Sequence, residues 1–180
     1  MRRVLAPILL LTLLFPALAY GVTLDDLVTQ DEIVYKKSKT PYTGTTTGLF
    51  QYTYKDGIRN GPFRVYYKNG RLKKKGNYRN GKQEGPYISY FPDGNIWTKG
   101  TYKVGKEDGL WIGYHEDIFV ESPELGRQLR EKGTYKDGKR EGYWVFYNLD
   151  RTKRLTGMSL GVTVFDEGSG TYKNGKKVSD

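Results

Sequence analysis

A segment of 24 residues, 76–99, recurs along this chain and restricts the folds that the chain can adopt. In each copy a tyrosine and a lysine or arginine precede a turn glycine, and in all copies but the last a second glycine follows four residues later. The turn glycines are Gly57, Gly81, Gly105, Gly138 and Gly175, and the second glycines are Gly61, Gly85, Gly109 and Gly142. Successive turn glycines are 24, 24, 33 and 37 residues apart. A period held over several copies indicates an array of supersecondary units that stack side by side.

Aromatic residues fall at fixed positions after the second glycine of each unit. The position two residues on, here called the +2 column, holds Phe63, Tyr87, Trp111 and Trp144. The +5 column holds Tyr66, Tyr90, Tyr114 and Tyr147, and the +3 column holds Arg64, Ile88, Ile112 and Val145. Aromatic and β-branched residues over six positions favour a β-strand. Because a strand alternates faces, the +2 and +5 columns are predicted on opposite faces of a sheet.

Short turns separate these strands. Asn69-Gly70 and Asp93-Gly94 close the first strand of a unit, and the sequence predicts a type I′ hairpin there because Asn-Gly and Asp-Gly adopt two positive φ angles most readily. Asn80-Gly81 and Asp137-Gly138 begin the next unit in the same way. Consecutive hairpins of this kind predict an all-β fold, an elongated antiparallel meander in which each unit packs on its neighbours.

The repeated pattern G-x-Y-K-D-G-K-x-E-G-x-W-x-x-Y, followed by N-G-x-L, resembles the MORN (membrane occupation and recognition nexus) repeat. More closely it is similar to the bacterial variant found in proteins labelled as antitoxins of toxin–antitoxin systems. Residues 27–48, with Val34-Tyr35-Lys36-Lys37 and Pro41-Tyr42-Thr43-Gly44, resemble the lead-in of those proteins, so the resemblance covers residues 27–177. It implies a repeat scaffold that neutralises a toxin by binding it.

The N-terminus has the pattern of a secretory signal. Arg2 and Arg3 precede 16 uncharged residues from Val4 to the Ala17-Leu18-Ala19 site, which predicts a signal peptide over residues 1–19, cleaved after Ala19. A membrane span needs about 20 apolar residues, and an uncleaved anchor is the alternative. The mature chain of 180 − 19 = 161 residues is expected in the periplasm or outside the cell. The chain has no cysteine, which excludes disulfides, thiolate metal sites and lipidation at a cysteine.

The rest of the chain divides into a lead-in, residues 20–47, and the array, residues 48–180. In the lead-in, a short helix is expected from Thr23, with Asp26 closing a capping box, and a strand is expected over residues 32–37. The units of the array are residues 48–75, 76–99, 100–132 with an insertion at 115–125, 133–156 and a partial unit at 157–180. A wider turn is expected at residues 148–151, and a further strand at residues 162–166.

Residues with catalytic potential are few. His115 is the only histidine, and no Gly-x-Ser-x-Gly elbow or cysteine accompanies it. Glu84, Asp108 and Glu141 recur before a glycine, which favours a role in turns over a catalytic pair. The insertion carries Glu116, Asp117, Glu121 and Glu124 without the spacing of a calcium loop. We therefore expect a protein that is not an enzyme and that holds neither metal nor cofactor.

The chain is basic, with a formal net charge of +10 at pH 7. Many of the cations flank predicted turns, where lysine protects exposed sheet edges from aggregation or forms a surface for an acidic partner. The basic surface is predicted at Lys73, Lys74, Lys75, Lys139 and Arg140. Basic residues interleaved with aromatics also suit nucleic acid, but an exported protein argues against that partner.

Three kinds of binding function follow. The first is a protein partner, such as a toxin, docked on the +2 and +5 columns or on the insertion residues His115, Glu116, Asp117 and Phe119. The second is the anionic headgroups of membrane lipids, bound by the basic turns. The third is a cell-envelope glycan, for which Trp97, Trp111 and Trp144 are too few to give one aromatic cage per repeat.

Overall fold

The computed structural model describes residues 21–30, 32–116, 129–148, 163–164 and 168–180. They form a 3₁₀ turn, η1 (Leu24–Asp26), and sixteen strands. The strands are β1 (Leu27–Gln30), β2 (Ile33–Lys36), β3 (Gly44–Thr45), β4 (Phe50–Lys55), β5 (Ile58–Tyr66), β6 (Leu72–Arg79), β7 (Lys82–Gln83), β8 (Gly85–Tyr90), β9 (Ile96–Lys103), β10 (Lys106–Glu107), β11 (Gly109–Tyr114), β12 (Leu129–Lys136), β13 (Lys139–Asn148), β14 (Thr163–Val164), β15 (Gly170–Lys173) and β16 (Lys176–Ser179).

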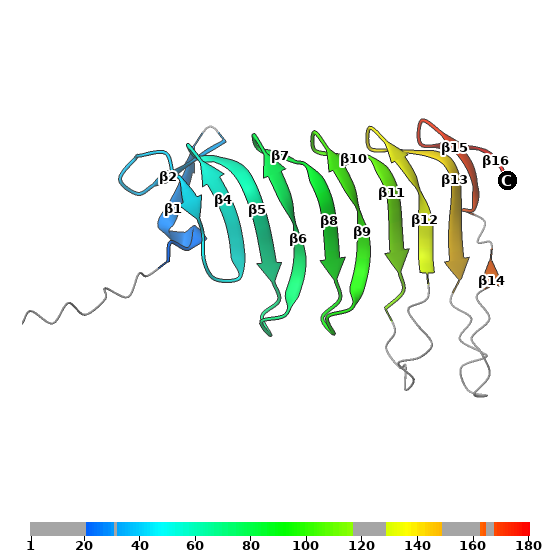
Figure 1. Cartoon of the computed structure of the whole chain (residues 1–180), viewed down its shortest axis with the longest axis horizontal. Helices are drawn as coiled ribbons and strands as arrows, with labels where there is room; N and C mark the ends of the chain where they lie inside the picture. The colour runs from blue at the N-terminus through cyan, green and yellow to red at the C-terminus, as the bar shows by residue number, and fades with distance from the viewer. Residues whose placement is uncertain (1–20, 31, 117–128, 149–162, 165–167) are drawn as a thin grey trace, which may run out of the picture.

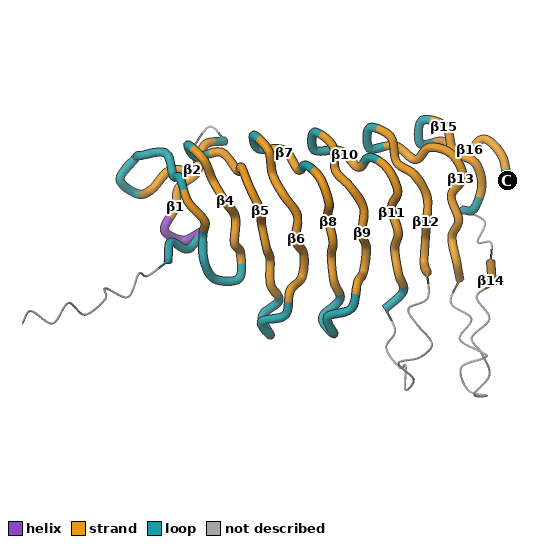
Figure 2. Tube along the Cα trace, in the orientation of Figure 1, coloured by secondary structure: helices purple, strands orange, loops and turns teal. Residues whose placement is uncertain are grey.

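The strands from β3 to β16 lie side by side in chain order in one antiparallel sheet (Figure 1). Short strands β7, β10 and β14 pair with β6, β9 and β13, while β1 and β2 form a separate hairpin. With strands about 4.8 Å apart, the eleven strands along the path from β3 to β16 extend over roughly 48 Å. The predicted elongated β-meander is confirmed. The connecting turns form two rows, one at each end of the strands, and we call each row of turns an edge of the sheet (Figure 2).

The structure of the lead-in, residues 20–47, agrees in part with the elements predicted from the sequence. The Thr23 backbone N–H donates to the Asp26 carboxylate at 2.9 Å, as the predicted capping box requires. The turn ends at Asp26, however, and Leu27 and Val28 belong to β1 instead of continuing the expected helix. The predicted strand at residues 32–37 is β2. Residues 1–19, where the signal peptide is expected, lie outside the described residues.

The turns at one edge of the sheet are two-residue hairpins with both central φ angles positive. They are Asp56-Gly57, Asn80-Gly81, Val104-Gly105, Asp137-Gly138 and Asn174-Gly175. These angles define the type I′ turn, whose twist matches that of the flanking strands. The same edge carries hydrogen bonds between units, since the backbone N–H of Gly105 donates to the Gln83 carbonyl and that of Gly138 to the Glu107 carbonyl, both at 2.9 Å.

The turns at the opposite edge differ from the prediction. In the turns at residues 67–71 and 91–95, Gly70 and Gly94 have positive φ, and Asn69 and Asp93 do not. The Gly70 N–H donates to the Tyr67 carbonyl at 2.9 Å, and the Asn69 side chain accepts the Arg71 N–H at 3.0 Å. Three-residue loops with a glycine bulge therefore replace the expected type I′ turns, because the Asn and Asp side chains bond the backbone two residues on. The wide turn expected at residues 148–151 falls mostly outside the described residues.

The core is a row of rings packed on one face of the sheet. Trp111 lies across Gly100 of β9, and Trp144 lies across Gly133 of β12, so closely that a Cβ on either glycine would overlap the indole. The Trp111 indole N–H donates to the Thr101 carbonyl at 3.2 Å, and the Trp144 indole N–H donates to the Thr134 carbonyl at 3.0 Å. A conformationally costly glycine in a strand is thus explained by the ring that covers it.

A tyrosine two residues after each glycine completes this packing. Tyr102 meets Trp111 edge-on with ring centroids 5.2 Å apart, and Tyr135 meets Trp144 at 4.8 Å. Such edge-to-face pairs add about 0.5–1.5 kcal/mol each beyond the area they bury. The repeated Gly-Thr-Tyr sequence therefore supplies a seat for the indole, an acceptor for its N–H and a ring against its edge.

One turn residue is poorly matched to its backbone. Val104 has φ +50°, where Asn or Asp stands in the other turns of this edge, and its side chain is exposed. A left-handed conformation costs an L-residue about 1–2 kcal/mol, and Asn tolerates it best. We expect Val104→Asn to raise the free energy of unfolding by about 1 kcal/mol, measured by urea denaturation. Val178→Asn, an exposed valine in β16, is the matched control, and an equal gain in both variants would contradict this explanation.

Candidate binding surfaces

The +2 column lies on the packed face, which we call the ring face. The exposed fraction is 2% for Phe63, 8% for Trp111 and 1% for Trp144, and Tyr87 is half-buried. Arg140 covers the end of this row, with its guanidinium carbon 4.9 Å from the Trp144 ring centroid. These rings are occupied by their neighbours and have little surface left for a partner.

The +5 column lies on the opposite face, which we call the open face. Tyr66, Tyr90, Tyr114 and Tyr147 are all half-buried there, and the Lys99 ammonium lies 6.0 Å from the Tyr114 ring centroid. Adjacent members of the column lie on alternate strands, about 10 Å apart. The open face therefore presents evenly spaced tyrosines on a rigid sheet.

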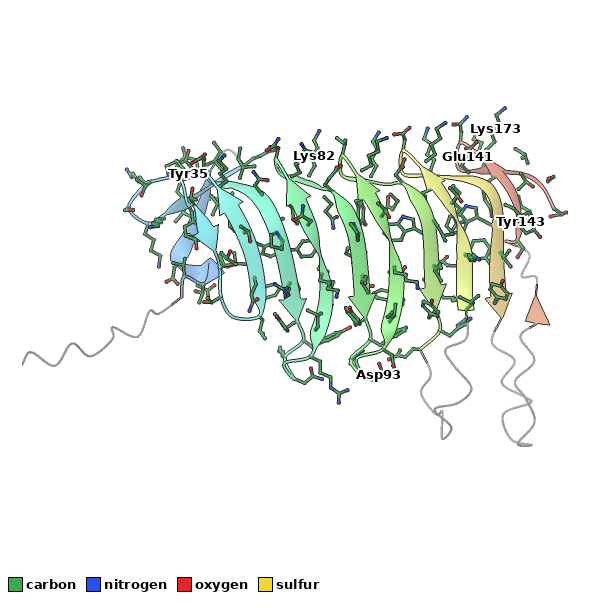
Figure 3. All side chains as sticks on the ribbon, viewed as in Figure 1. Tyr35, Lys82, Asp93, Glu141, Tyr143 and Lys173 are labelled. Carbon is green, nitrogen blue, oxygen red and sulfur yellow. The ribbon has the colours of Figure 1, made fainter. Side chains whose placement is uncertain are left out.

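Two further apolar residues on the open face were not selected from the sequence. Leu110 of β11 is 51% exposed and Tyr143 of β13 is 52% exposed, and Figure 3 shows Tyr143 on the sheet near its C-terminal end. They stand one residue after the second glycine, where the first two units have Pro62 and Pro86. The sequence signal was the replacement of proline by a large apolar residue at that position.

Of the insertion residues, the structure places His115 and Glu116. A ring nitrogen of His115, Nε2, lies 2.7 Å from the Tyr147 carbonyl oxygen, so the histidine connects the end of β11 to β13. Glu116 is exposed, and Asp117 and Phe119 lie outside the described residues. Within the part of the chain that the structure describes, no group of three or more histidine, aspartate or glutamate residues is arranged to hold a metal ion.

Basic side chains gather along the edge formed by the type I′ turns, which we call the basic edge. Figure 3 shows Lys82 and Lys173 on this edge, with Asp93 at the opposite one. The basic residues that flank its turns are Lys55, Arg79, Lys82, Lys103, Lys106, Lys136, Lys139, Lys173 and Lys176. Successive turns are two strands apart, which gives a row of cations at intervals of about 10 Å.

The carboxylates before the second glycines stabilise this edge. Glu84 accepts the backbone N–H of Val104 at 2.8 Å, and Glu141 accepts that of Asn174 at 3.0 Å. Asp108 occupies the same position and accepts the Asp137 N–H at 3.4 Å. Each carboxylate thus bonds the turn of the following unit, the turn role that the sequence favoured.

The residues predicted as one basic surface lie in different places. Lys139 belongs to the basic edge, whereas the Arg140 guanidinium packs on the rings of the ring face. Lys73 and Lys75 are exposed on β6, and Lys74 is half-buried and points to the face opposite to that of Lys75. The basic edge is therefore the continuous cationic feature, and the run at residues 73–75 is divided between two faces.

Burial among the rings also changes the acidity of the tyrosines. Burial raises the pKa of Tyr52 and of Tyr87, against a lowering by Arg59 and by Ser89 respectively. Burial first, and then the Glu107 carboxylate 3.3 Å from its hydroxyl, raise the pKa of Tyr102 far above its ordinary value. These hydroxyls stay protonated at neutral pH and serve as neutral hydrogen-bonding groups.

Comparison with known families finds a match for two segments of the sheet. Residues 59–80 and 83–103 match the MORN repeat variant, which covers β5 to β9. Repeats of this kind generally bind proteins or membranes. The match is to the repeat and does not support the antitoxin-like family. No curated protein matches the chain. In the described residues no helix has the length and apolar character needed to cross a membrane.

Proposed function

We propose that this chain is a non-enzymatic binding protein that docks a protein partner on its open face. The observation that carries the proposal is the pair Leu110 and Tyr143, large apolar side chains more than half exposed beside the half-buried +5 tyrosines. Leu110 pairs across the ladder with Thr134 of β12, and β13 with Tyr143 follows on the other side of β12. The two side chains thus belong to one patch of the sheet.

A protein surface suits this patch better than a small molecule. Tyrosine is enriched at protein interfaces because it offers a large contact area with few rotatable bonds. The strands that carry the patch are held by backbone ladders, so little conformational entropy is lost when a partner binds. The His115 ring is bonded to a backbone carbonyl, which supports binding over catalysis.

Neutralisation of a toxin is the specific form of this function that we propose. It rests on the resemblance of residues 27–177 to antitoxin-like repeat proteins and on the secretory pattern of residues 1–19. A binding protein exported to the periplasm or beyond would act as an immunity protein against a toxin that works there. The partner of an immunity protein is usually encoded beside it, which supplies a source of candidates.

We expect the mature protein to retain the product of an adjacent gene in a pull-down and to protect a cell that expresses that product. Leu110→Glu and Tyr143→Glu should each weaken binding by about tenfold or more, because each puts a charge in the apolar centre of the interface. Pro62→Glu, an exposed residue at the same position two units earlier, is the matched control. Absence of any retained partner, or equal binding by all three variants, would refute the proposal.

Anionic lipid headgroups are a second candidate, favoured by the row of cations on the basic edge. A straight edge of lysines can approach a flat membrane along its whole length, and each lysine near an anionic surface contributes about 1 kcal/mol. On this alternative the sheet would stand on the membrane by its type I′ turns. Both broad faces would then remain free for a protein partner.

Vesicle sedimentation tests the lipid candidate. We expect binding to vesicles that contain phosphatidylserine, weaker binding at higher salt, and none to phosphatidylcholine alone. Combining Lys82→Glu, Lys106→Glu and Lys139→Glu should reduce binding by roughly a hundredfold or more. Lys68→Glu, at an exposed turn of the opposite edge, is the control. Binding that is insensitive to salt and to the triple change would exclude the basic edge as the lipid contact.

A further inference from the structure

All three tryptophans of the chain line one hollow on the ring face. Trp97 of β9, Trp111 of β11 and Trp144 of β13 contribute to its wall, and its volume is about 190 Å³. They are 14 and 33 residues apart in the sequence, and the order of strands brings them together. Three tryptophans are too few to give one aromatic binding cage per repeat, but together they can form one binding site.

The hollow lies where the repeat changes. The position four residues after the second glycine holds Val65, Ser89 and Phe146 in three units, and Gly113 in the unit that forms the hollow. A Cβ at Gly113 would lie 2.9 Å from Nη2 of Arg130 and 3.0 Å from Cγ of Glu131. The missing side chain thus makes room for a charged pair beside the indoles.

The charged pair has unused hydrogen-bonding capacity. Arg130 Nη2 donates to Glu131 Oε1 at 2.6 Å. The Arg130 Nε–H is buried and has no acceptor among the described residues. The Arg130 side chain as a whole is 38% exposed and that of Glu131 is 25% exposed, and both line the hollow. The pair therefore offers a donor and a carboxylate acceptor next to each other.

The surrounding charges limit the class of ligand. A cationic ligand would meet the Arg130 guanidinium in the wall. An anionic ligand would meet the carboxylates of Glu107 and Glu131, and an apolar ligand would cover the charged pair without offering it a hydrogen bond. A neutral ring that carries hydroxyl groups satisfies both members of the pair, because a hydroxyl both donates and accepts.

We propose that this hollow binds the ring of a neutral saccharide. The apolar face of the sugar would pack on Trp97, which is 41% exposed, while adjacent hydroxyls bond Arg130 and Glu131. The volume is below the 300–1,000 Å³ or so of sites for drug-sized ligands, which limits the site to a single sugar unit. The site lies on the face opposite the proposed protein-docking patch and does not depend on it.

Tryptophan fluorescence tests the site, since every tryptophan of the chain lines it. The probes are glucose, galactose and N-acetylglucosamine, each free and as a trisaccharide. We expect a saturable change with at least one probe, at a Kd of the order of 1 mM. Arg130→Met should weaken binding about tenfold or more. Lys132→Met, on the same strand and pointing to the open face, should leave the Kd unchanged.

A second variant distinguishes loss of the binding site from loss of folding. Gly113→Ser introduces the residue that stands at this position in the second unit and should abolish the titration while circular dichroism shows an intact sheet. The proposal is overturned if no probe gives saturation up to about 50 mM, far above a Kd of about 1 mM. It is equally overturned if choline saturates the signal instead, or if Arg130→Met and Lys132→Met have the same affinity.

Discussion

The packing of an indole across a glycine of the neighbouring strand is the interaction on which this sheet depends. A single-layered sheet has no interior, so its aromatic rings can be buried only by packing against residues of the neighbouring strands. Trp111 on Gly100 and Trp144 on Gly133 achieve this, and each indole N–H finds a backbone carbonyl on the strand that it covers. If these glycines carried side chains, the indole could not lie flat on the sheet and would remain exposed to solvent.

This packing assigns different roles to the parts of the sheet. The ring face is used for stability, and the open face and the basic edge remain accessible. The Gly113 position is the exception on the ring face, because the place of a packed side chain is taken by Arg130 and Glu131. Departures from the repeat, such as Gly113, Leu110 and Tyr143, are therefore where specific binding is proposed.

The sequence predicted the architecture because its signals are local. The glycine period and the alternation of aromatic residues specify strands and turns without knowledge of distant contacts. The turns at Asn69-Gly70 and Asp93-Gly94 were predicted wrongly, since a side chain that accepts the N–H two residues on favours a three-residue loop. The meeting of Trp97, Trp111 and Trp144 depends on strand order and register, which the one-dimensional pattern does not supply.

The free energy of unfolding of Gly100→Ala is the most direct test of the indole–glycine packing. In an ordinary strand, alanine is more stable than glycine by about 0.5–1 kcal/mol. Here the added Cβ overlaps the Trp111 ring, and we expect destabilisation by about 1–3 kcal/mol. Thr101→Ala, whose exposed side chain lies on the other face, controls for strand propensity. An unchanged or increased stability of Gly100→Ala would contradict the dependence of the sheet on this contact.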